Sequence, residues 1–419
     1  MKAAILCIGD ELLIGQVVNT NSSWLGHILG SNGIAVVYTA CVQDDVAAIR
    51  TGLDDAKAKA DIILITGGLG PTKDDITKKT ICEYFGMGWR MDEKVLASVT
   101  EFFKRYGKEI NEINSLQAKV PDGCIAFVNK NGTAPGMWFE IEGKVFVSMP
   151  GVPFEMKGIM ENDVLPMLQK KFALPFIYHK TILTLGIGES VLAEKIETWE
   201  DSLAQHHIKL AYLPAPGVVR LRMSISGANE KECVDIVEEK AKELLSIVGG
   251  YIFGYGEDTI EKVIGDILRE RKETLALAES CTGGNIGHMI VSVPGSSEYF
   301  IGGIVSYAND IKSAQLDVPV KMINENGVVS EPVVRLMAEN IRKKFRTTYG
   351  LGISGIAGPG GGTAEKPVGT VWMSVSGPKG TFSRKMLFGD NRERNIQRSS
   401  VMALGMLRKF ILDELKDHE

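Results

Sequence analysis

Short runs of apolar, largely β-branched residues alternate with amphipathic stretches through the first 170 residues, and this alternation constrains the fold more than any other feature. The runs at 3–9, 34–42, 61–68 and 144–151 predict strands, and 20–33 predicts a helix that Asn or Ser caps at its start. Strands that alternate with helices predict βαβ units and a mostly parallel sheet. Ligands bind such sheets beyond the carboxyl ends of the strands, so we expect a site there.

The same alternation returns after residue 253, with predicted strands at 273–280, 302–308, 350–355 and 369–375. Between the two regions the order is strand, helix, hairpin and long helix, which predicts a small α+β module. We therefore predict an α/β protein in which two α/β domains with mainly parallel sheets, 1–170 and 253–419, flank a linking or dimerisation module at 171–252. At roughly 100–200 residues per domain, 419 residues accommodate this organisation.

Charge and composition exclude several classes of protein. The formal net charge of −5 removes the simplest case for a nucleic-acid binder, and no apolar run approaches the ~18–20 residues of a membrane span. Six scattered cysteines without a CxxC pair indicate a reduced, cytoplasmic protein. Six histidines without a metal-binding spacing make zinc improbable, so any metal would be a hard cation held by carboxylates.

The sequence ALAESCTGGNIG places Ser280 where an apolar strand ends and a helix of small residues begins. At such a turn, outward-facing amides of Thr282, Gly283 and Gly284 could bind phosphate or an oxyanion. The alternative interpretation is that Ser280 only caps the helix.

A serine nucleophile here needs a base, and no histidine lies near these motifs. Lys312 is the candidate base, since burial can lower the pKa of a lysine, and Tyr307 is a candidate orienter or proton relay. Cys281 is a rival nucleophile, although a lone cysteine is more often a small buried residue. Expected substrate-binding residues include Gly355, Gly358 and Gly360 of the glycine-rich segment, together with Arg392 as a phosphate fork or a surface arginine.

Six motifs in this region, AESCTGG, GGIVSYANDIK, GVVSEPV, SGIAGPGGG, EKPVGTVW and FGDNRERN, resemble the nicotinamide-nucleotide amidase domain over about 255–412. The resemblance implies hydrolysis of nicotinamide mononucleotide to nicotinate mononucleotide and ammonia, without a cofactor. It also implies Ser280 as nucleophile and Lys312 as general base, with Tyr307 beside them. Because Asn391 interrupts the family's usual GD-R loop, either Arg392 or Arg394 could contact the phosphate.

In the first domain, TGGLGPTKDD at 66–75 combines a glycine loop with adjacent carboxylates. Loop amides can hold phosphate and carboxylates can hold a divalent cation, although acidic residues also favour helix starts. The expected metal ligands are Asp10, Glu11, Asp44, Asp74 and Asp75, with Asp45 beside them. The expected substrate-binding residues are Gly67, Gly68, Gly70, Thr72, Asn131, Gly132, Thr133, Gly151 and Glu155.

GDELLIGQVVNTNSSWL, TGGLGPTKDD, NGTAPG and MPGVPFEM together resemble the molybdopterin-binding-like domain of the competence/damage-inducible protein A (CinA) family. The resemblance implies hydrolysis of ADP-ribose to AMP and ribose 5-phosphate with Mg, Mn or Co. It implies a KH-like middle module that joins two subunits as a homodimer; GIGE at 186–189 lacks the GxxG loop that RNA binding needs. Two alternatives are an amidase with a pterin-binding or adenylyl-transfer module, and a non-enzymatic partner in competence or recombination.

Overall fold

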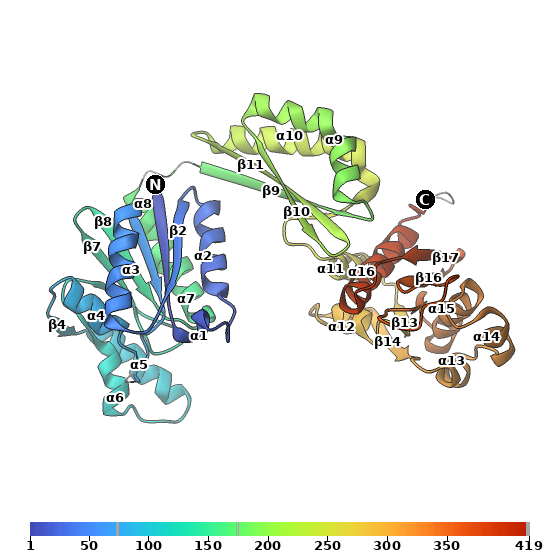
Figure 1. The fold of residues 1–419 in the computed structure, drawn as a ribbon, viewed down its shortest axis with the longest axis horizontal. Helices are drawn as coiled ribbons and strands as arrows, with labels where there is room; N and C mark the ends of the chain where they lie inside the picture. The colour runs from blue at the N-terminus through green and yellow to red at the C-terminus, as the bar shows by residue number, and fades with distance from the viewer. Residues whose placement is uncertain (73–74, 173, 175, 416–419) are drawn as a thin grey trace. The chain divides into compact units, whose positions relative to one another are not determined.

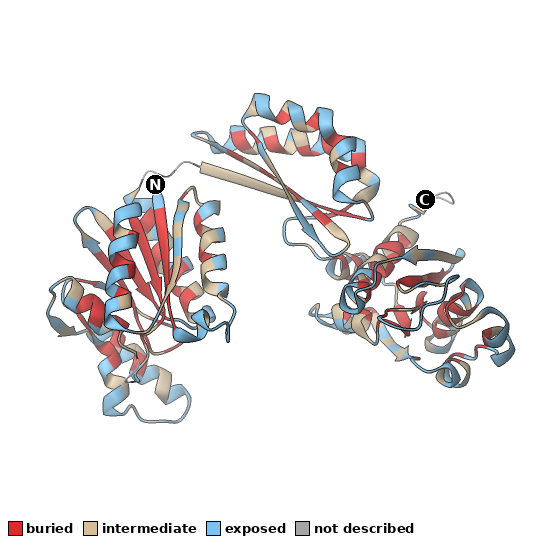
Figure 2. Ribbon diagram, viewed as in Figure 1, coloured by how far each residue is buried: buried red, intermediate tan, exposed pale blue. Residues whose placement is uncertain are grey.

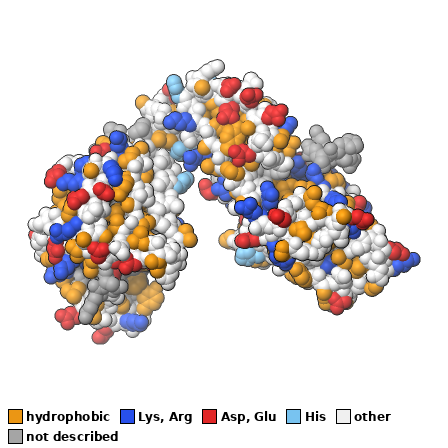
Figure 3. Space-filling view, in the orientation of Figure 1, with side chains coloured by type: hydrophobic (Ala, Val, Ile, Leu, Met, Phe, Trp, Pro, Cys, Tyr) orange, Lys and Arg blue, Asp and Glu red, His pale blue; other side chains and the backbone are white. Residues whose placement is uncertain are grey.

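The computed structural model describes residues 1–72, 75–172, 174 and 176–415 (Figure 1). Two compact units divide the chain, one formed by Met1–Tyr178 with Ser226–Cys233 and the other by His179–Ile225 with Val234–Glu419. Acidic and basic side chains are interspersed over the visible face of each unit (Figure 3). None of the helices in the described ranges is both long enough and apolar enough to cross a bilayer.

The first unit is built on a six-stranded sheet of order β2-β1-β3-β8-β7-β6. β1 (Lys2–Ile8), β2 (Ala35–Val42), β3 (Ile62–Thr66) and β8 (Lys144–Met149) pair in parallel, which confirms the predicted strands. β7 (Gly136–Ile141) and β6 (Ile125–Phe127) add an antiparallel edge. The sheet is therefore mixed, with its parallel strands together.

Helices cover both faces of this sheet, which explains why β1 is apolar without alternation. Ala3, Ile5 and Cys7 of β1 pack in one core with α2 (Thr20–Ser31) and α7 (Pro153–Ile159). Ala4, Leu6 and Ile8 pack in a second core with α3 (Val46–Lys59) and α4 (Thr77–Tyr84). Figure 2 shows these strands buried between exposed helix faces.

Side chains of polar residues start the helices that follow β1 and β2. The Asn19 side chain accepts a hydrogen bond from the amide of Ser22, and Asp45 accepts from the amides of Ala47 and Ala48. Asp45 is therefore a helix cap, so the expectation that it contributes to a metal site is not supported. The remaining strands and α-helices of this region are α1 (Asp10–Leu13), β4 (Trp89–Met91), α5 (Glu93–Arg105), α6 (Glu112–Ser115), β5 (Lys119–Pro121) and α8 (Leu165–Lys171).

The middle module has a four-stranded sheet of order β10-β11-β9-β12, covered by two helices (Figure 1). Its elements are β9 (Phe176–Leu185), α9 (Glu189–Leu203), β10 (Lys209–Ala215), β11 (Val218–Gly227), α10 (Glu230–Val248) and β12 (Ile252–Tyr255). The predicted hairpin is present as the antiparallel pair β10–β11. The indole N–H of Trp199 on α9 donates to the carbonyl of Lys240 on α10 at 3.0 Å and joins the two helices.

The C-terminal region carries a five-stranded sheet of order β14-β13-β15-β16-β17. β13 (Leu275–Glu279), β14 (Phe300–Val305) and β15 (Tyr349–Gly355) are parallel, whereas β16 (Thr370–Gly377) and β17 (Gly380–Leu387) form an antiparallel hairpin at one edge. β17 was not anticipated from the sequence. None of its residues is buried, and Gly380, Lys385 and Leu387 are exposed, as expected of an edge strand.

Helices again cover both faces of this sheet. Ala276 and Ala278 of β13 pack with α15 (Glu331–Phe345), and the neighbouring helices on the chain are α13 (Asn309–Leu316) and α14 (Val320–Asn326). Leu275 and Leu277 pack on the other face with α11 (Ile260–Arg271), α12 (Asn285–Val291) and α16 (Arg392–Ile411). β13 is consequently the central, fully buried strand, and its carboxyl end points at the first candidate site.

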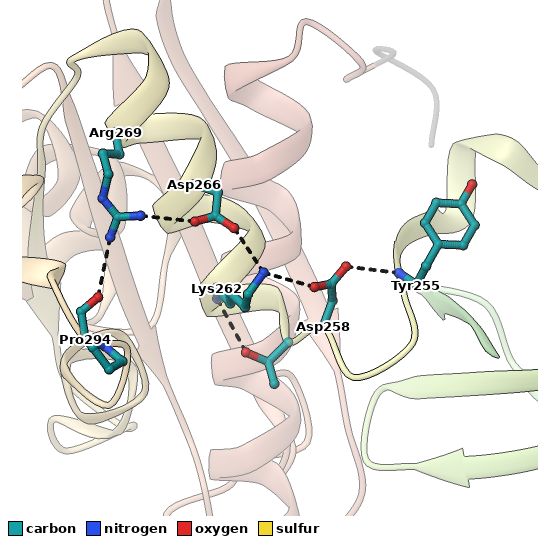
Figure 4. Close-up of polar contacts among 7 residues, drawn as sticks. Tyr255, Asp258, Lys262, Asp266, Arg269 and Pro294 are labelled. Carbon is teal, nitrogen blue, oxygen red and sulfur yellow. Dashed lines mark hydrogen bonds and ion pairs between the residues drawn. The ribbon is translucent and has the colours of Figure 1, made fainter. Parts of the chain in front are cut away.

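The middle module and the C-terminal region share one hydrophobic core within the second unit: Leu183, Leu185 and Phe253 pack with residues of α16. A line of polar contacts links β12 to α11 (Figure 4). The amide of Tyr255 donates to Asp258, and the Lys262 ammonium lies 3.1 Å from carboxylate oxygens of both Asp258 and Asp266. Arg269 continues the line from Asp266 to the carbonyl of Pro294.

Candidate active sites

Ser280 directly follows β13, at the start of a tight turn into α12. The turn passes through Gly283 and Gly284 with φ of 63° and 98°, a left-handed backbone that favours glycine. The amide of Gly283 donates to the carbonyl of Ser280 at 3.0 Å and closes the turn. This local geometry holds Ser280, which is 7% exposed, at the carboxyl edge of the sheet.

The carboxylate of Glu279 fills the inside of this turn. Its Oε2 accepts from the Thr282 hydroxyl at 2.6 Å and from the amides of Gly284 and Ile286 at 3.1 and 3.2 Å, while its Oε1 accepts from the Gly287 amide at 2.8 Å. A buried carboxylate with four donors is well compensated, and it holds the start of α12 against the strand end.

This arrangement corrects one expectation from the sequence. The amides of Gly283 and Gly284 are not directed at a ligand, because the Ser280 carbonyl and the Glu279 carboxylate accept their hydrogen bonds. The hydroxyl of Thr282 donates to Glu279, and the predicted role of the Thr282 amide stays a prediction. None of these three residues lines the neighbouring cavity. Sequence reasoning missed Glu279, although an acidic residue at the end of an otherwise apolar strand was a visible signal.

Lys312, on α13, brings its ammonium to Ser280. Its Nζ lies 3.0 Å from Ser280 Oγ, 2.6 Å from the carbonyl oxygen of Ser306 and 3.4 Å from that of Tyr307. The side chain is 1% exposed, and burial lowers the pKa of Lys312 below its ordinary value of 10.5. A lysine with a lowered pKa yields more neutral amine near neutral pH, which can accept the serine proton.

Cys281, the rival nucleophile, is held as a thiol. Burial raises its pKa from 9.0 to about 12, and the side chain is 7% exposed. Since the thiolate is the nucleophilic form of cysteine, this environment suppresses its reactivity near neutral pH. The geometry therefore favours Ser280 over Cys281.

Tyr307 and Arg392 form the opposite side of the site. The Tyr307 hydroxyl accepts a hydrogen bond from Arg392 Nη2 at 2.9 Å, and Arg392 Nη1 donates to the carbonyl of Gly358 at 2.8 Å. Tyr307 reaches Lys312 through its backbone carbonyl rather than its hydroxyl, so the arrangement does not support the expected proton relay. Arg392 lines the cavity and Arg394 does not, which distinguishes the two arginines.

A cavity of about 270 Å³ joins these groups. Ser280, Cys281, Lys312, Tyr307, Arg392 and the expected glycines Gly355, Gly358 and Gly360 line it, together with Asn309 and Ser354, which the sequence did not single out. Gly355 is required by packing, because a Cβ there would lie 2.7 Å from Val371 and 3.0 Å from Cys281.

A second cavity, of about 300 Å³, lies in the first unit beyond the carboxyl ends of β1, β3 and β8. The expected residues Glu11, Asp44, Gly67, Gly68, Asp75 and Gly151 line it, together with Asn21 and Thr66. Gly67 and Gly68 have φ of 114° and 63°, and a Cβ on Gly68 would lie 2.1 Å from the Thr77 hydroxyl oxygen. The glycine loop is therefore folded tightly over the start of α4.

Some of the expected residues are not on this cavity. Asp10 accepts a hydrogen bond from the amide of Asp44 at 3.3 Å. Asp75, which does line the cavity, accepts hydrogen bonds from the amide and the hydroxyl of Thr72. Neither Asp10, Gly70 nor Thr72 lines the cavity, and Asp74 lies outside the described residues.

The cluster at 131–133 and Glu155 is likewise separate from this cavity. Glu155 accepts from the side-chain amide of Asn129 at 2.6 Å, and burial raises the Glu155 pKa. A Cβ at Gly132 would lie 2.3 Å from the Glu155 carboxyl carbon. Gly132 thus allows Glu155 to pack closely. Asn131, Gly132, Thr133 and Glu155 lie outside the lining of this cavity, and their predicted contacts with substrate stay a prediction.

The donor chemistry of the second cavity suits a hard cation, since Glu11, Asp44 and Asp75 supply only oxygen ligands. Among the residues that the structure describes, however, no three His, Cys, Asp or Glu side chains are grouped as they would be around a metal ion. The divalent cation remains a prediction.

Three families of known proteins match this chain, one in each of the three regions described above. Residues 4–170 match the probable molybdopterin binding domain, 179–254 the damage-inducible protein CinA KH domain and 257–411 the CinA C-terminal domain. A CinA-like protein of Flavobacterium psychrophilum is 49% identical over 98% of this chain and 99% of its own length. One from Cytophaga hutchinsonii is 42% identical over 97% of both chains. The solved structure of the competence/damage inducible protein CihA from Agrobacterium tumefaciens is 33% identical, covers 36% of this chain and 92% of its own, and has a TM-score of 0.35.

Proposed function

The chain belongs to the CinA family, and from that premise we propose that its C-terminal domain hydrolyses the carboxamide of nicotinamide mononucleotide to nicotinate mononucleotide and ammonia. The observation that carries this proposal is the buried pair of Lys312 Nζ and Ser280 Oγ, 3.0 Å apart at the edge of a cavity. The choice of substrate comes from the resemblance of the motifs to the amidase domain.

In the proposed reaction, the neutral amine of Lys312 takes the proton from the Ser280 hydroxyl as Oγ attacks the carboxamide carbon. The protonated Lys312 then gives that proton to the departing nitrogen, so ammonia leaves and an acyl-enzyme remains on Ser280. Water, deprotonated by the again-neutral Lys312, attacks the ester and releases the carboxylate. The proton passes back to Ser280 through Lys312, which restores both groups.

Arg392 is suited to bind the phosphate of the nucleotide. Its guanidinium is planar and carries five donors, two of which contact Gly358 and Tyr307, so the remaining donors are available to phosphate oxygens in the cavity. The half-exposed ring of Tyr307, which lines the same cavity, can stack on an aromatic base.

The test of this proposal is the Ser280→Ala variant in an ammonia-release assay with nicotinamide mononucleotide. Without the serine oxygen no acyl-enzyme forms, so we expect kcat to fall by at least about 1,000-fold. Far-ultraviolet circular dichroism of the variant is the control for folding. Near-normal ammonia release by folded Ser280→Ala would exclude the covalent mechanism.

The cavity of the first unit favours a second activity, hydrolysis of the phosphoanhydride of ADP-ribose to AMP and ribose 5-phosphate. Gly67 and Gly68 of the glycine loop line this cavity beside the carboxylates Glu11, Asp44 and Asp75. The amide of Gly67 donates to the carbonyl of Met149 at 3.2 Å, so we propose that other amides of the loop bind the diphosphate. Carboxylates beside a diphosphate require a neutralising cation, for which we propose Mg, Mn or Co. Incubation of the full chain with ADP-ribose and each metal, with AMP measured, tests this activity.

Both proposed substrates arise from the breakdown of pyridine dinucleotides, which is why we place the protein in the salvage of these nucleotides. We further propose that it works in the cytoplasm as a homodimer joined through the middle module. Analytical ultracentrifugation of the full chain tests the dimer.

A further inference from the structure

A third cavity, of about 240 Å³, lies inside the second unit, where the middle module meets the C-terminal region. Its walls come from the end of β9, the segment Gly249–Tyr251, β12, the hairpin β16–β17 and the second half of α16. The proposed amide hydrolysis uses none of its residues, and no residue is shared with the cavity around Ser280.

The body of this cavity is apolar and adaptable. Four methionines, Met373, Met386, Met402 and Met406, line it together with Leu185 and Phe253. Methionine side chains are unbranched and polarisable, and they adjust to differently shaped apolar ligands. These residues suit an aliphatic or aromatic group rather than a polar one.

The charged residues of the lining have one sign only. Arg384, Arg408 and Lys409 line the cavity, and none of the described residues that line it is acidic. A ligand that fills the apolar body therefore meets three cationic side chains and no carboxylate.

Two of these cations, Arg384 and Arg408, have guanidinium N–H groups without an acceptor among the described residues. Arg384 is half-buried, and its guanidinium forms no hydrogen bond or ion pair with another described residue, although its backbone belongs to the β16–β17 ladder. Arg408 pairs through Nη1 with Glu414 at 3.0 Å, but its Nε is buried without an acceptor. The buried Nε of Arg408 is unfavourable without an acceptor, and the Arg384 guanidinium is only partly exposed to water. An anionic oxygen is the partner that matches guanidinium donors best.

We propose that this cavity binds a small organic anion, a carboxylate, phosphate or sulfonate carried on an apolar body. Arg384 binds the anionic group and the methionine-lined wall takes the apolar body. Because the walls come from both the middle module and the C-terminal region, a bound ligand also stabilises the junction between them.

The experiment uses the full chain and two fluorescent probes that share an aromatic body. 8-Anilino-1-naphthalenesulfonate carries a sulfonate, whereas N-phenyl-1-naphthylamine is neutral. We expect saturable binding of the sulfonate with an affinity about tenfold higher than that of the neutral probe, in line with a charge-assisted hydrogen bond. The sulfonate is also expected to raise the thermal unfolding temperature of the protein.

Three variants locate the site. Arg384→Ala should weaken sulfonate binding about tenfold and leave the neutral probe within twofold, whereas Met402→Trp should weaken both by filling the apolar wall. The matched control is Arg398→Ala, which removes an exposed arginine of α16 that does not line the cavity.

Unsaturable sulfonate binding, equal affinity for both probes, or equal effects of Arg384→Ala and Arg398→Ala would each overturn the proposal. None of these measurements depends on amide hydrolysis. Failure of this proposal is therefore distinguishable from failure of the proposed enzymatic function.

Discussion

Replacing Lys312 by methionine tests the proposed chemistry at its most specific point. The variant keeps an unbranched side chain of similar length but removes the group that lies 3.0 Å from Ser280 Oγ. A general base contributes about 10²–10⁴-fold to a rate, so we expect kcat for ammonia release to fall by that factor, or about 3–5 kcal/mol in activation free energy.

The structure predicts that this loss of activity occurs without unfolding. The substitution leaves the Ser306 carbonyl, now 2.6 Å from Lys312 Nζ, without that donor, at a cost of about 1–3 kcal/mol. It also removes the free-energy cost of burying the charged form of Lys312, which favours the folded state of the variant. The two effects oppose each other, so we expect the free energy of unfolding to change by less than about 2 kcal/mol.

The pH dependence distinguishes a base from a merely structural lysine. Because burial lowers the pKa of Lys312, kcat/KM of the wild type should rise with pH through that lowered pKa and then level off, as the neutral amine becomes available. Between the folded-state pKa and 10.5, the unfolded chain binds more protons at this residue than the folded chain. The wild type should therefore gain stability as pH rises through this window, and Lys312→Met should lack that gain.

Two further variants serve as controls in the same ammonia assay. Lys321→Met removes a lysine on α14 whose side chain is 83% exposed, and it should retain full activity. Lys312→Arg keeps the positive charge but cannot release its proton, so it should be inactive. Activity of folded Lys312→Met above about a tenth of wild type, with an unchanged pH profile, would refute Lys312 as the base.

The remaining predictions concern the neighbours of Ser280 and the first unit. Cys281→Ala should keep kcat within about threefold of wild type, because a thiol with a pKa near 12 takes no part in the reaction; a loss comparable to that of a nucleophile variant would reverse the assignment. Glu279→Gln should lower the free energy of unfolding, measured in urea, by about 1–3 kcal/mol, because the new side-chain N–H₂ faces a backbone donor such as the amide of Gly287. We also expect kcat to fall while KM stays unchanged, and an unchanged kcat would show that Glu279 does not position the site. Chelation of divalent metal should stop AMP formation from ADP-ribose and spare ammonia release, and Asp44→Asn should lower the first activity by at least about 100-fold; equal loss of both activities on chelation would contradict separate sites.

The residue pattern alone was sufficient to predict the α/β fold, because most of the parallel strands in the two α/β domains are apolar runs that end close to a glycine, a serine or an acidic residue. The strands β4 to β7, β12 and β17, most of them short or half-buried, were not predicted. The order of strands, helices and hairpin in the middle module follows from periodicity in the same way. The sequence also singled out Ser280 and Lys312, since a strand-end serine without a nearby histidine leaves lysine as the available base.

Only the tertiary structure decided which of these candidates meet. Ser280 and Lys312 are 32 positions apart in the chain, and they come together because β13 and β14 are parallel neighbours with Glu279 paired to Val305, which brings both strand ends to one edge. Periodicity could not assign the β16–β17 edge or the direction of the amides after Ser280. Both depend on long-range packing: the first on strand pairing, and the second on the buried carboxylate of Glu279, which turns the amide of Gly284 away from the cavity.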